Sequence, residues 1–272
     1  MKKFLALLLI VLTGIGISCG RAEKGGDTLV LLKTEFGNIK LKLYDETPGH
    51  QKNFIKLVNE GFYNGLLFHR VMENFMIQGG DPDSKNAQPG ARLGSGNVGY
   101  TIPAEFVPKY FHKKGALAAA RTGGPSNPEK RSSGAQFYIV QGAVMTAGAL
   151  DTMEMALNNR SRNEFYKTKF DAAANELNEC KKNNDLDGFN VLVAEIRAQA
   201  DSLWATHETI AFTPEQREAY TTVGGYPSLD GEYTVFGEVV EGFDVIDKIA
   251  AAETDKNNRP LNDIKMEMEV IK

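Results

Sequence analysis

The sequence predicts a mainly β fold that is interrupted by a long α-helical hairpin. Residues 28–141 and 213–272 hold short apolar runs separated by Gly, Pro, Asn and Asp, a spacing typical of an all-β barrel or sandwich. Residues 146–206 contain almost no Gly or Pro and carry apolar residues at helical spacing. The composition, 42% hydrophobic and 24% charged over 272 residues, is ordinary for a globular domain with an accessory.

The N-terminal segment is predicted to be a targeting signal rather than part of the fold. Lys2 and Lys3 precede the apolar run FLALLLIVL, and small residues then lead to Cys19. The run is too short to be a good membrane span. This arrangement resembles a bacterial lipoprotein signal, so we expect a signal peptide at 1–18, acylation of Cys19 and a polar tether at 19–27.

The lipoprotein interpretation places the protein in the bacterial cell envelope, exported and anchored to a membrane on its periplasmic or surface side. Gly16 stands where such signals usually carry an aliphatic residue, so an ordinary secretory signal is the alternative. A lipid on Cys19 would leave Cys180 as the only other cysteine, which predicts a fold without an intrachain disulfide.

The first elements after the tether are a β-hairpin and a helix. Residues 28–45 form two β-rich runs around FGN, and the second run alternates apolar and polar residues from position 39. Thr47 is a predicted N-cap with Pro48 at the first helical position, and Gly61 is the predicted stop.

Short strands are predicted across residues 62–141 and again in the segment that begins at 231. A helix is expected at about 241–252. The final alternating run, IKMEMEVI, is expected to close the sheet.

The inserted segment predicts two helices joined by the turn KKNNDLDG. We expect their apolar stripes to pack on each other or on the barrel. A third short helix is predicted from Thr213, which forms a capping box with Gln216. The two apolar stripes are Tyr166, Phe170, Ala173, Leu177 and Cys180, then Phe189, Leu192, Ile196, Ala200 and Leu203.

Three blocks of the sequence resemble, in order, the signatures of the cyclophilins, which are peptidyl-prolyl cis-trans isomerases. They are FHRVMENFMIQGGDP (68–82), ALAAARTGG…SSGAQFYIV (116–140) and SLDGEYTVFGEVVEGFDVIDKI (228–249). The resemblance implies an eight-stranded antiparallel barrel capped by two helices. It covers about 28–141 and 213–272, so the cyclophilin-type domain would span 28–272 with the helical insertion at about 142–212.

The same resemblance implies the site residues. Arg70 falls on the catalytic arginine, and Gln78 falls on a residue that contacts the peptide backbone. Ser228 stands where cyclosporin-sensitive relatives carry Trp, so we expect weak cyclosporin binding. The implied substrate-binding residues are Phe75, Met76, Ala120, Gln136, Phe137, Tyr138, Leu229 and Tyr233.

These residue types suit rotation about an X-Pro bond. Amide resonance sets a barrier of about 18–20 kcal/mol, and localising the nitrogen lone pair weakens that resonance. A guanidinium can donate to the prolyl nitrogen only once the bond has twisted, so the interaction belongs to the transition state. Such a charge-assisted bond contributes about 1.5–3 kcal/mol, or roughly ten- to hundredfold in rate. No metal or cofactor is required.

Other candidates receive structural interpretations. We expect His69 to hold a loop through hydrogen bonds rather than to act as a base, and Asp81 to be a turn residue. The formal net charge of −4 and the absence of a basic block argue against nucleic-acid binding.

The sequence therefore predicts a peptidyl-prolyl isomerase that acts on proline-containing segments of exported proteins and assists their folding. The alternative is a non-catalytic chaperone or scaffold that only grips such segments. For the insertion, recruitment of a client or partner and a packed extension without function both remain open.

Overall fold

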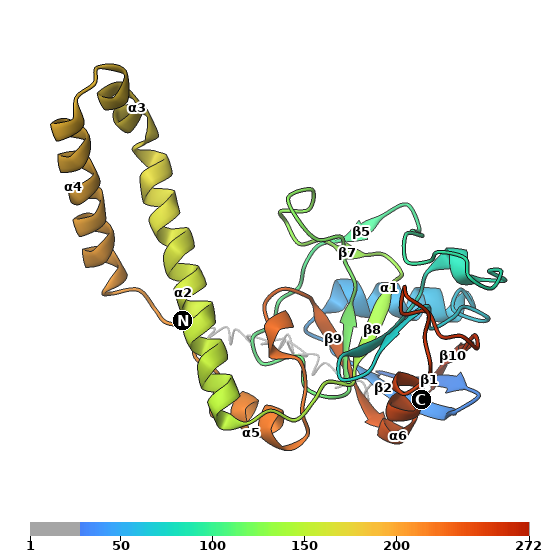
Figure 1. The fold of residues 1–272 in the computed structure, drawn as a ribbon. Coiled ribbons are helices and arrows are strands. Elements are labelled where there is room, and N and C mark those ends of the chain that lie inside the picture. Colours follow the sequence, from blue (N-terminus) through green and yellow to red (C-terminus); the bar gives the residue numbers. More distant parts are fainter. Residues whose placement is uncertain (1–27, 272) are drawn as a thin grey trace, which may run out of the picture.

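The computed structural model describes residues 28–271, which form a curled antiparallel sheet with helices around it (Figure 1). Eight strands pair in the order β10-β1-β2-β9-β6-β8-β4-β3, and β5 and β7 form a separate pair. This confirms the predicted eight antiparallel strands. The strands are β1 (Thr28–Thr34), β2 (Gly37–Leu43), β3 (Arg70–Met72), β4 (Met76–Gly79), β5 (Thr101–Ile102), β6 (Ala116–Ala119), β7 (Ser132–Ser133), β8 (Phe137–Val140), β9 (Val235–Glu241) and β10 (Glu267–Ile271).

The two edge strands of the sheet, β3 and β10, are joined through the segments that precede them. The backbone amides of Gly65 and Phe68 donate to the carbonyls of Met266 and Ile264, each at 2.9 Å. Leu67 and Lys265 form an antiparallel bridge. The curled sheet is thus a half-barrel whose open side is partly closed by irregular chain.

Helices α1 (Pro48–Asn59) and α6 (Phe243–Ala250) pack their apolar faces into the same core as the sheet. As predicted, α1 begins at Pro48, directly after Thr47, and ends just before Gly61. Its capping differs from the prediction because the Thr47 hydroxyl donates to the Tyr44 carbonyl instead. The Glu105 carboxylate, far away in sequence, accepts from the first amides of the helix.

The insertion forms a helical hairpin that extends away from the sheet (Figure 1). One arm consists of α2 (Ala147–Ala172) and α3 (Ala174–Lys182), and α4 (Leu186–Trp204) returns along it. The predicted stripes therefore pack on each other and not on the barrel. Few side chains are buried between the arms; Leu177, Ile196 and Ala200 are the main ones. At the end of α4, Trp204 stacks on His207 with ring centroids 4.4 Å apart.

The start of the insertion meets the chain that follows it beside the sheet. Gly225 forms antiparallel bridges to Ala143 and to Lys113. Helix α5 (Pro214–Thr222) begins with the predicted capping box of Thr213 and Gln216. Tyr220 of α5 and Leu150 of α2 are fully buried together in a small cluster of their own.

The predicted signal peptide, Cys19 and the tether lie outside the described residues. Within residues 28–271, no helix is long and apolar enough to cross a membrane.

Candidate active site

The β3–β4 hairpin brings the two predicted catalytic side chains together. Arg70 lies directly opposite Gln78 in the antiparallel pairing, so both side chains emerge on one face. The tight turn between the strands includes Asn74, whose φ of 61° is in the left-handed region that Asn tolerates. Arg70 Nη1 donates to Gln78 Oε1 at 3.1 Å.

A chain of amides fixes the orientation of Gln78. Its Nε2 donates to Gln136 Oε1 at 3.1 Å. Gln136, which is buried, donates in turn to the backbone carbonyls of Gly94 and Gly96 at 3.1 and 2.8 Å. The donor and acceptor of each amide are therefore assigned by its neighbours. Gln136 supports the site from behind, consistent with its place in the second sequence block.

Arg70 is held by weak, neutral partners. Besides Gln78, its Nη2 lies 3.2 Å from Met72 Sδ, and its guanidinium lies over the Phe75 ring, 5.5 Å from the centroid. Among residues 28–271 no carboxylate forms an ion pair with it. The positive charge at this position is consequently not neutralised within the described chain, and it remains available to an acceptor in the cavity.

A cavity of about 140 Å³ opens beside this arginine. Its floor and walls come from the β3–β4 hairpin, the residues directly after β6, strand β8 and the segment 229–233, and they include all but two of the predicted site residues. Arg121 also lines the cavity. It directly follows Ala120 in the second block but was not among the predicted site residues. The lining residues are Arg70, Phe75, Met76, Gln78, Ala120, Arg121, Tyr138, Leu229 and Tyr233.

Phe137 does not line this cavity, which corrects its predicted place in the pocket. Side chains alternate along a strand, so neighbouring residues of β8 face opposite sides of the sheet. Phe137 points into the main core, where its ring packs edge-on against Phe54 at 5.6 Å and Tyr63 at 5.5 Å. Tyr138 faces the other way, into the cavity. Phe137 therefore supports the sheet behind the pocket.

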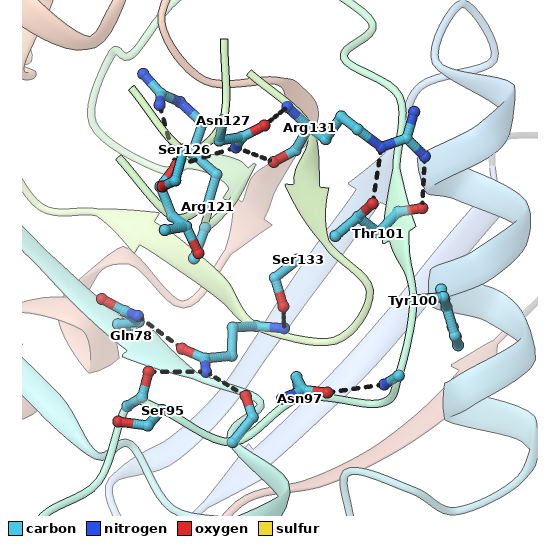
Figure 2. Close-up of a pocket in the computed structure, with 16 residues that line it drawn as sticks. Gln78, Ser95, Asn97, Tyr100, Thr101, Arg121, Ser126, Asn127, Arg131 and Ser133 are labelled. Atoms are coloured by element: carbon cyan, nitrogen blue, oxygen red, sulfur yellow. Dashed lines mark hydrogen bonds between the residues drawn. The ribbon is translucent and has the colours of Figure 1, made fainter. Parts of the chain in front are cut away.

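A larger cavity of about 970 Å³ adjoins the first and shares Gln78, Ala120 and Arg121 with it (Figure 2). The loops at 94–101 and 121–133 form most of its lining. Arg131 reaches across these loops and donates to the Thr101 carbonyl at 3.1 Å. Both charged residues that line this cavity are arginines, Arg121 and Arg131. A polypeptide extending beyond the smaller cavity would meet these two arginines, which are paired with Glu232 and Glu129.

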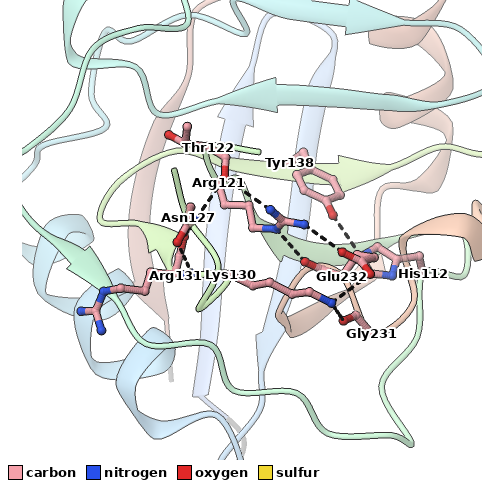
Figure 3. Close-up of polar contacts among 9 residues, drawn as sticks. All are labelled: His112, Arg121, Thr122, Asn127, Lys130, Arg131, Tyr138, Gly231 and Glu232. Carbon is pink, nitrogen blue, oxygen red and sulfur yellow. Dashed lines mark hydrogen bonds and ion pairs between the residues drawn. The ribbon is translucent and has the colours of Figure 1, made fainter. Parts of the chain in front are cut away.

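Arg121 is part of a small ionic cluster at the rim. It donates to the Glu232 carboxylate at 2.9 Å, and Lys130 binds the other oxygen of that carboxylate at the same distance (Figure 3). The Arg121 guanidinium also covers the Tyr233 ring at 4.6 Å. Tyr233 packs edge-on against Tyr138 at 5.8 Å. The cluster thereby fixes one aromatic wall of the smaller cavity.

His69 lies outside both cavities and is not bonded as predicted. Its side chain is buried, yet neither ring nitrogen has a hydrogen-bond partner among the described residues. Burial lowers the pKa of His69 to about 4, so the ring is neutral at neutral pH. Asp81 is a turn residue, as predicted: it caps a short 3₁₀ helix (Pro82–Ser84) by accepting from the Asp83 amide at 2.9 Å.

Comparisons with known proteins agree with this geometry. Residues 29–204 and 209–270 match the family described as cyclophilin type peptidyl-prolyl cis-trans isomerase/CLD, a match that runs through most of the insertion. A provisionally named peptidyl-prolyl cis-trans isomerase of Staphylococcus saprophyticus is 29% identical over 88% of this chain and 89% of its own length.

Two further matches extend the comparison. A provisionally named bifunctional phosphatase/peptidyl-prolyl cis-trans isomerase of Streptococcus pyogenes is 28% identical over 88% of this chain, which spans only 37% of that longer protein. A crystal structure of a cyclophilin type peptidyl-prolyl cis-trans isomerase of Cryptosporidium parvum superposes with a TM-score of 0.51 at 19% identity. That superposition covers 90% of this chain and 98% of the other, and it supports the fold.

Proposed function

The chain belongs to the family of cyclophilin-type peptidyl-prolyl cis-trans isomerases, and from this premise we propose that it accelerates X-Pro rotation in exported proteins and assists their folding in the cell envelope. The observation that carries the proposal is the pairing of Arg70, which forms no ion pair with a carboxylate of residues 28–271, and an oriented glutamine beside an aromatic-lined cavity.

In this proposal the prolyl ring enters the smaller cavity, between Phe75, Met76 and Tyr138. Arg70 then lies beside the prolyl nitrogen. As the amide twists, the nitrogen gains a localised lone pair, which accepts a hydrogen bond from the guanidinium. Because the planar ground state offers no such acceptor, the bond lowers the barrier without tightening substrate binding.

Gln78 holds the peptide backbone while the bond rotates. Its amide orientation is already set by Arg70 and Gln136, so little reorganisation is needed on binding. The apolar walls exclude water and strengthen the charge-assisted bond. The reaction makes and breaks no covalent bond, so positioning and electrostatics are sufficient.

Replacing Arg70 tests the catalytic proposal. We expect Arg70→Ala to lower kcat/KM on an X-Pro peptide roughly ten- to hundredfold, the share of one charge-assisted bond. Arg160→Ala, on the exposed surface of α2, is the matched control and should leave the rate unchanged. Equal rates for wild type and Arg70→Ala would end the assignment.

The competing function is a proline-segment binder without catalysis. It predicts that wild type binds an X-Pro peptide but does not speed its isomerisation, and that Arg70→Ala binds equally well. Magnetisation-exchange NMR on one peptide measures both quantities in the same sample. The uncompensated charge of Arg70 favours the enzyme, because ground-state binding of a neutral prolyl ring gives it no acceptor.

The envelope location rests on the N-terminal sequence alone. We propose cleavage before Cys19 and acylation of that residue, which would tether the domain to a membrane through residues 19–27. Metabolic labelling with a palmitate analogue tests this, with Cys19→Ser as the comparison. Label that persists in Cys19→Ser, or a cleaved protein without label, would contradict it.

The insertion is proposed to recruit clients. Asn158 and Ile210 exchange two hydrogen bonds, of 2.7 and 2.8 Å, across the base of the hairpin. Joining these positions through a short Gly linker would remove 159–209 while keeping the buried cluster at Leu150 and Tyr220. Recruitment predicts unchanged activity on a short peptide and slower refolding of a proline-limited protein client. If both substrates respond alike, recruitment is wrong.

A further inference from the structure

A continuous series of buried and partly buried hydrogen bonds leads from the wall of the smaller cavity to helix α5, which directly follows the insertion. It begins at Tyr138, whose ring lines the cavity and whose hydroxyl lies 2.9 Å from His112 Nε2 (Figure 3). Tyr138 and His112 are both buried, and a buried phenol needs such a partner. Burial holds the pKa of Tyr138 well above its usual range, so the hydroxyl stays protonated and donates.

Asp230 sets the tautomer of His112. One carboxylate oxygen, Oδ1, accepts from the His112 backbone amide at 2.8 Å and lies 2.9 Å from ring atom Nδ1. Nδ1 therefore carries a hydrogen, and Nε2 presents a lone pair to the Tyr138 hydroxyl. Asp230 also directly follows Leu229, another residue of the cavity wall.

The second oxygen of Asp230 is held by α5. Oδ2 accepts from the Tyr220 hydroxyl at 2.6 Å and from Gln216 Nε2 at 3.3 Å. Gln216 is also the residue that closes the capping box of α5, through Thr213. Tyr220 is fully buried against Leu150 of α2, so its hydroxyl cannot swing away without disturbing that cluster.

Separate contacts join the segments that flank the insertion to the opposite wall. The amides of Gln141 and Gly142 both donate to the Phe75 carbonyl at 3.0 Å. The Phe75 ring packs on Tyr226, which follows α5, with centroids 4.3 Å apart. The Phe75 side of the cavity thus contacts the chain on both sides of the insertion.

We propose that His112, Asp230 and Tyr220 are positioning residues for the isomerase, through which the packing of α5 fixes the Tyr138 ring and Leu229 against the prolyl ring. This rests on the proposed isomerase activity and extends it: α5 is part of the active-site framework, and so is the base of the insertion, because Leu150 of α2 packs against Tyr220. When the chain of bonds is cut, the Tyr138 ring gains freedom and the cavity holds the prolyl ring less closely.

Tyr220→Phe removes one hydroxyl outside the cavity and retains the ring that packs in the cluster. We expect kcat/KM on an X-Pro peptide to fall about two- to tenfold, the range set by one hydrogen bond. Tyr166→Phe is the matched control: this tyrosine also donates to an aspartate, Asp201, within the insertion but far along the hairpin. It should leave kcat/KM unchanged.

A double-mutant cycle separates positioning from simple loss of stability. Tyr138→Phe cuts the chain of bonds at the cavity, so Tyr220→Phe should have no further effect on kcat/KM in that background. A purely structural role predicts a lower melting temperature in both backgrounds and an unchanged kcat/KM for the folded enzyme. Asp230→Asn retains Oδ1 but removes the oxygen that accepts from the Tyr220 hydroxyl, so it should lower kcat/KM by a similar factor. This variant replaces Tyr220→Phe in the test if Tyr220→Phe folds poorly.

Two results would overturn the proposal while leaving the isomerase assignment intact. One is wild-type kcat/KM in folded Tyr220→Phe and Asp230→Asn. The other is that Tyr220→Phe lowers kcat/KM by the same factor in the wild-type and the Tyr138→Phe backgrounds. An inactive wild type would instead contradict the proposed function itself.

Discussion

The half-barrel and the helical hairpin of this chain are stabilised in different ways. In the half-barrel, all four residues of β6 and all four of β8 are buried, and Ile77, Leu117 and Ile139 are completely inaccessible to solvent. In the hairpin, the 26 residues of α2 bury one side chain and the 19 residues of α4 bury two. Burial of apolar surface is the main stabilising contribution. The half-barrel is therefore expected to be rigid and stable, and the hairpin only marginally stable.

This difference shows which region holds its side chains in fixed positions. The cavity lies on strands whose other face is locked in the core, so its side chains cannot shift without disturbing that core. The hairpin has no such support beyond its base, where the cluster at Leu150 and Tyr220 ties it to α5. Substitutions in the half-barrel should therefore destabilise the whole fold, whereas substitutions in the hairpin should have smaller and local effects on stability.

The largest effect is expected in the sheet. Ile139→Ala should lower the global free energy of unfolding by about 2–5 kcal/mol, because it leaves a cavity in a fully buried site. Ile196→Ala, in the hairpin, should loosen only α2–α4 and leave global stability nearly unchanged. Urea unfolding together with hydrogen exchange resolves the two. Equal global losses would show that the two regions unfold as one unit.

A pH-dependent effect should be confined to the half-barrel. His69 has a folded pKa of about 4 against an ordinary 6.5, so in that interval the unfolded chain binds a proton that the folded chain does not. Stability is thus retained above about pH 6.5 and falls by roughly 3 kcal/mol as the pH drops towards 4.

His69→Gln should flatten this dependence, leaving a smaller slope from His50, whose pKa burial also lowers. Urea midpoints measured across that interval check it. An unchanged slope in His69→Gln would rule out His69 as the cause.

The base of the hairpin should respond to loss of its helix cap. Thr213→Ala removes the capping box of α5 and should cost about 1 kcal/mol of stability, whereas Thr213→Ser keeps the hydroxyl and should cost much less. Thermal denaturation compares the two variants. If Ser and Ala lower the melting temperature equally, the hydroxyl is not the stabilising group.

The smallest change concerns an exposed residue at the rim of the cavity. Ser228 offers neither a large ring nor an indole N–H, so we expect weak cyclosporin binding. Ser228→Trp should strengthen binding while kcat/KM on a peptide stays the same. Calorimetric titration measures it, and tight binding by wild type would refute the expectation.

Local patterns predicted the elements well and long-range contacts poorly. The alternation after Gly37, Pro48 at the start of α1 and the Thr213 capping box all appear as expected, because each depends on neighbours in sequence. The cap of α1 by Glu105 did not, since that carboxylate arrives from a distant loop. His69 was misjudged for a related reason: a motif does not reveal whether a buried ring finds a partner.

For the candidate site too, residues within local motifs were predicted and long-range contacts were not. The three sequence blocks identified eight of the nine residues that line the smaller cavity, with Arg121 the exception. The side of the sheet that Phe137 faces requires the strand register, which the motif comparison does not supply. The link from Tyr138 to His112 joins residues 26 positions apart, and His112 lies outside all three blocks.

The sole tryptophan gives the two regions separate optical signals. Trp204 lies at the end of α4, between His207 and Phe165, while tyrosines occur in both regions. Selective excitation of the indole therefore reports the hairpin alone, and unfolding of the half-barrel would be nearly silent in that emission. A tryptophan emission transition that precedes the loss of hydrogen-exchange protection in the sheet would reveal the hairpin melting on an intact catalytic domain, in the unmodified protein.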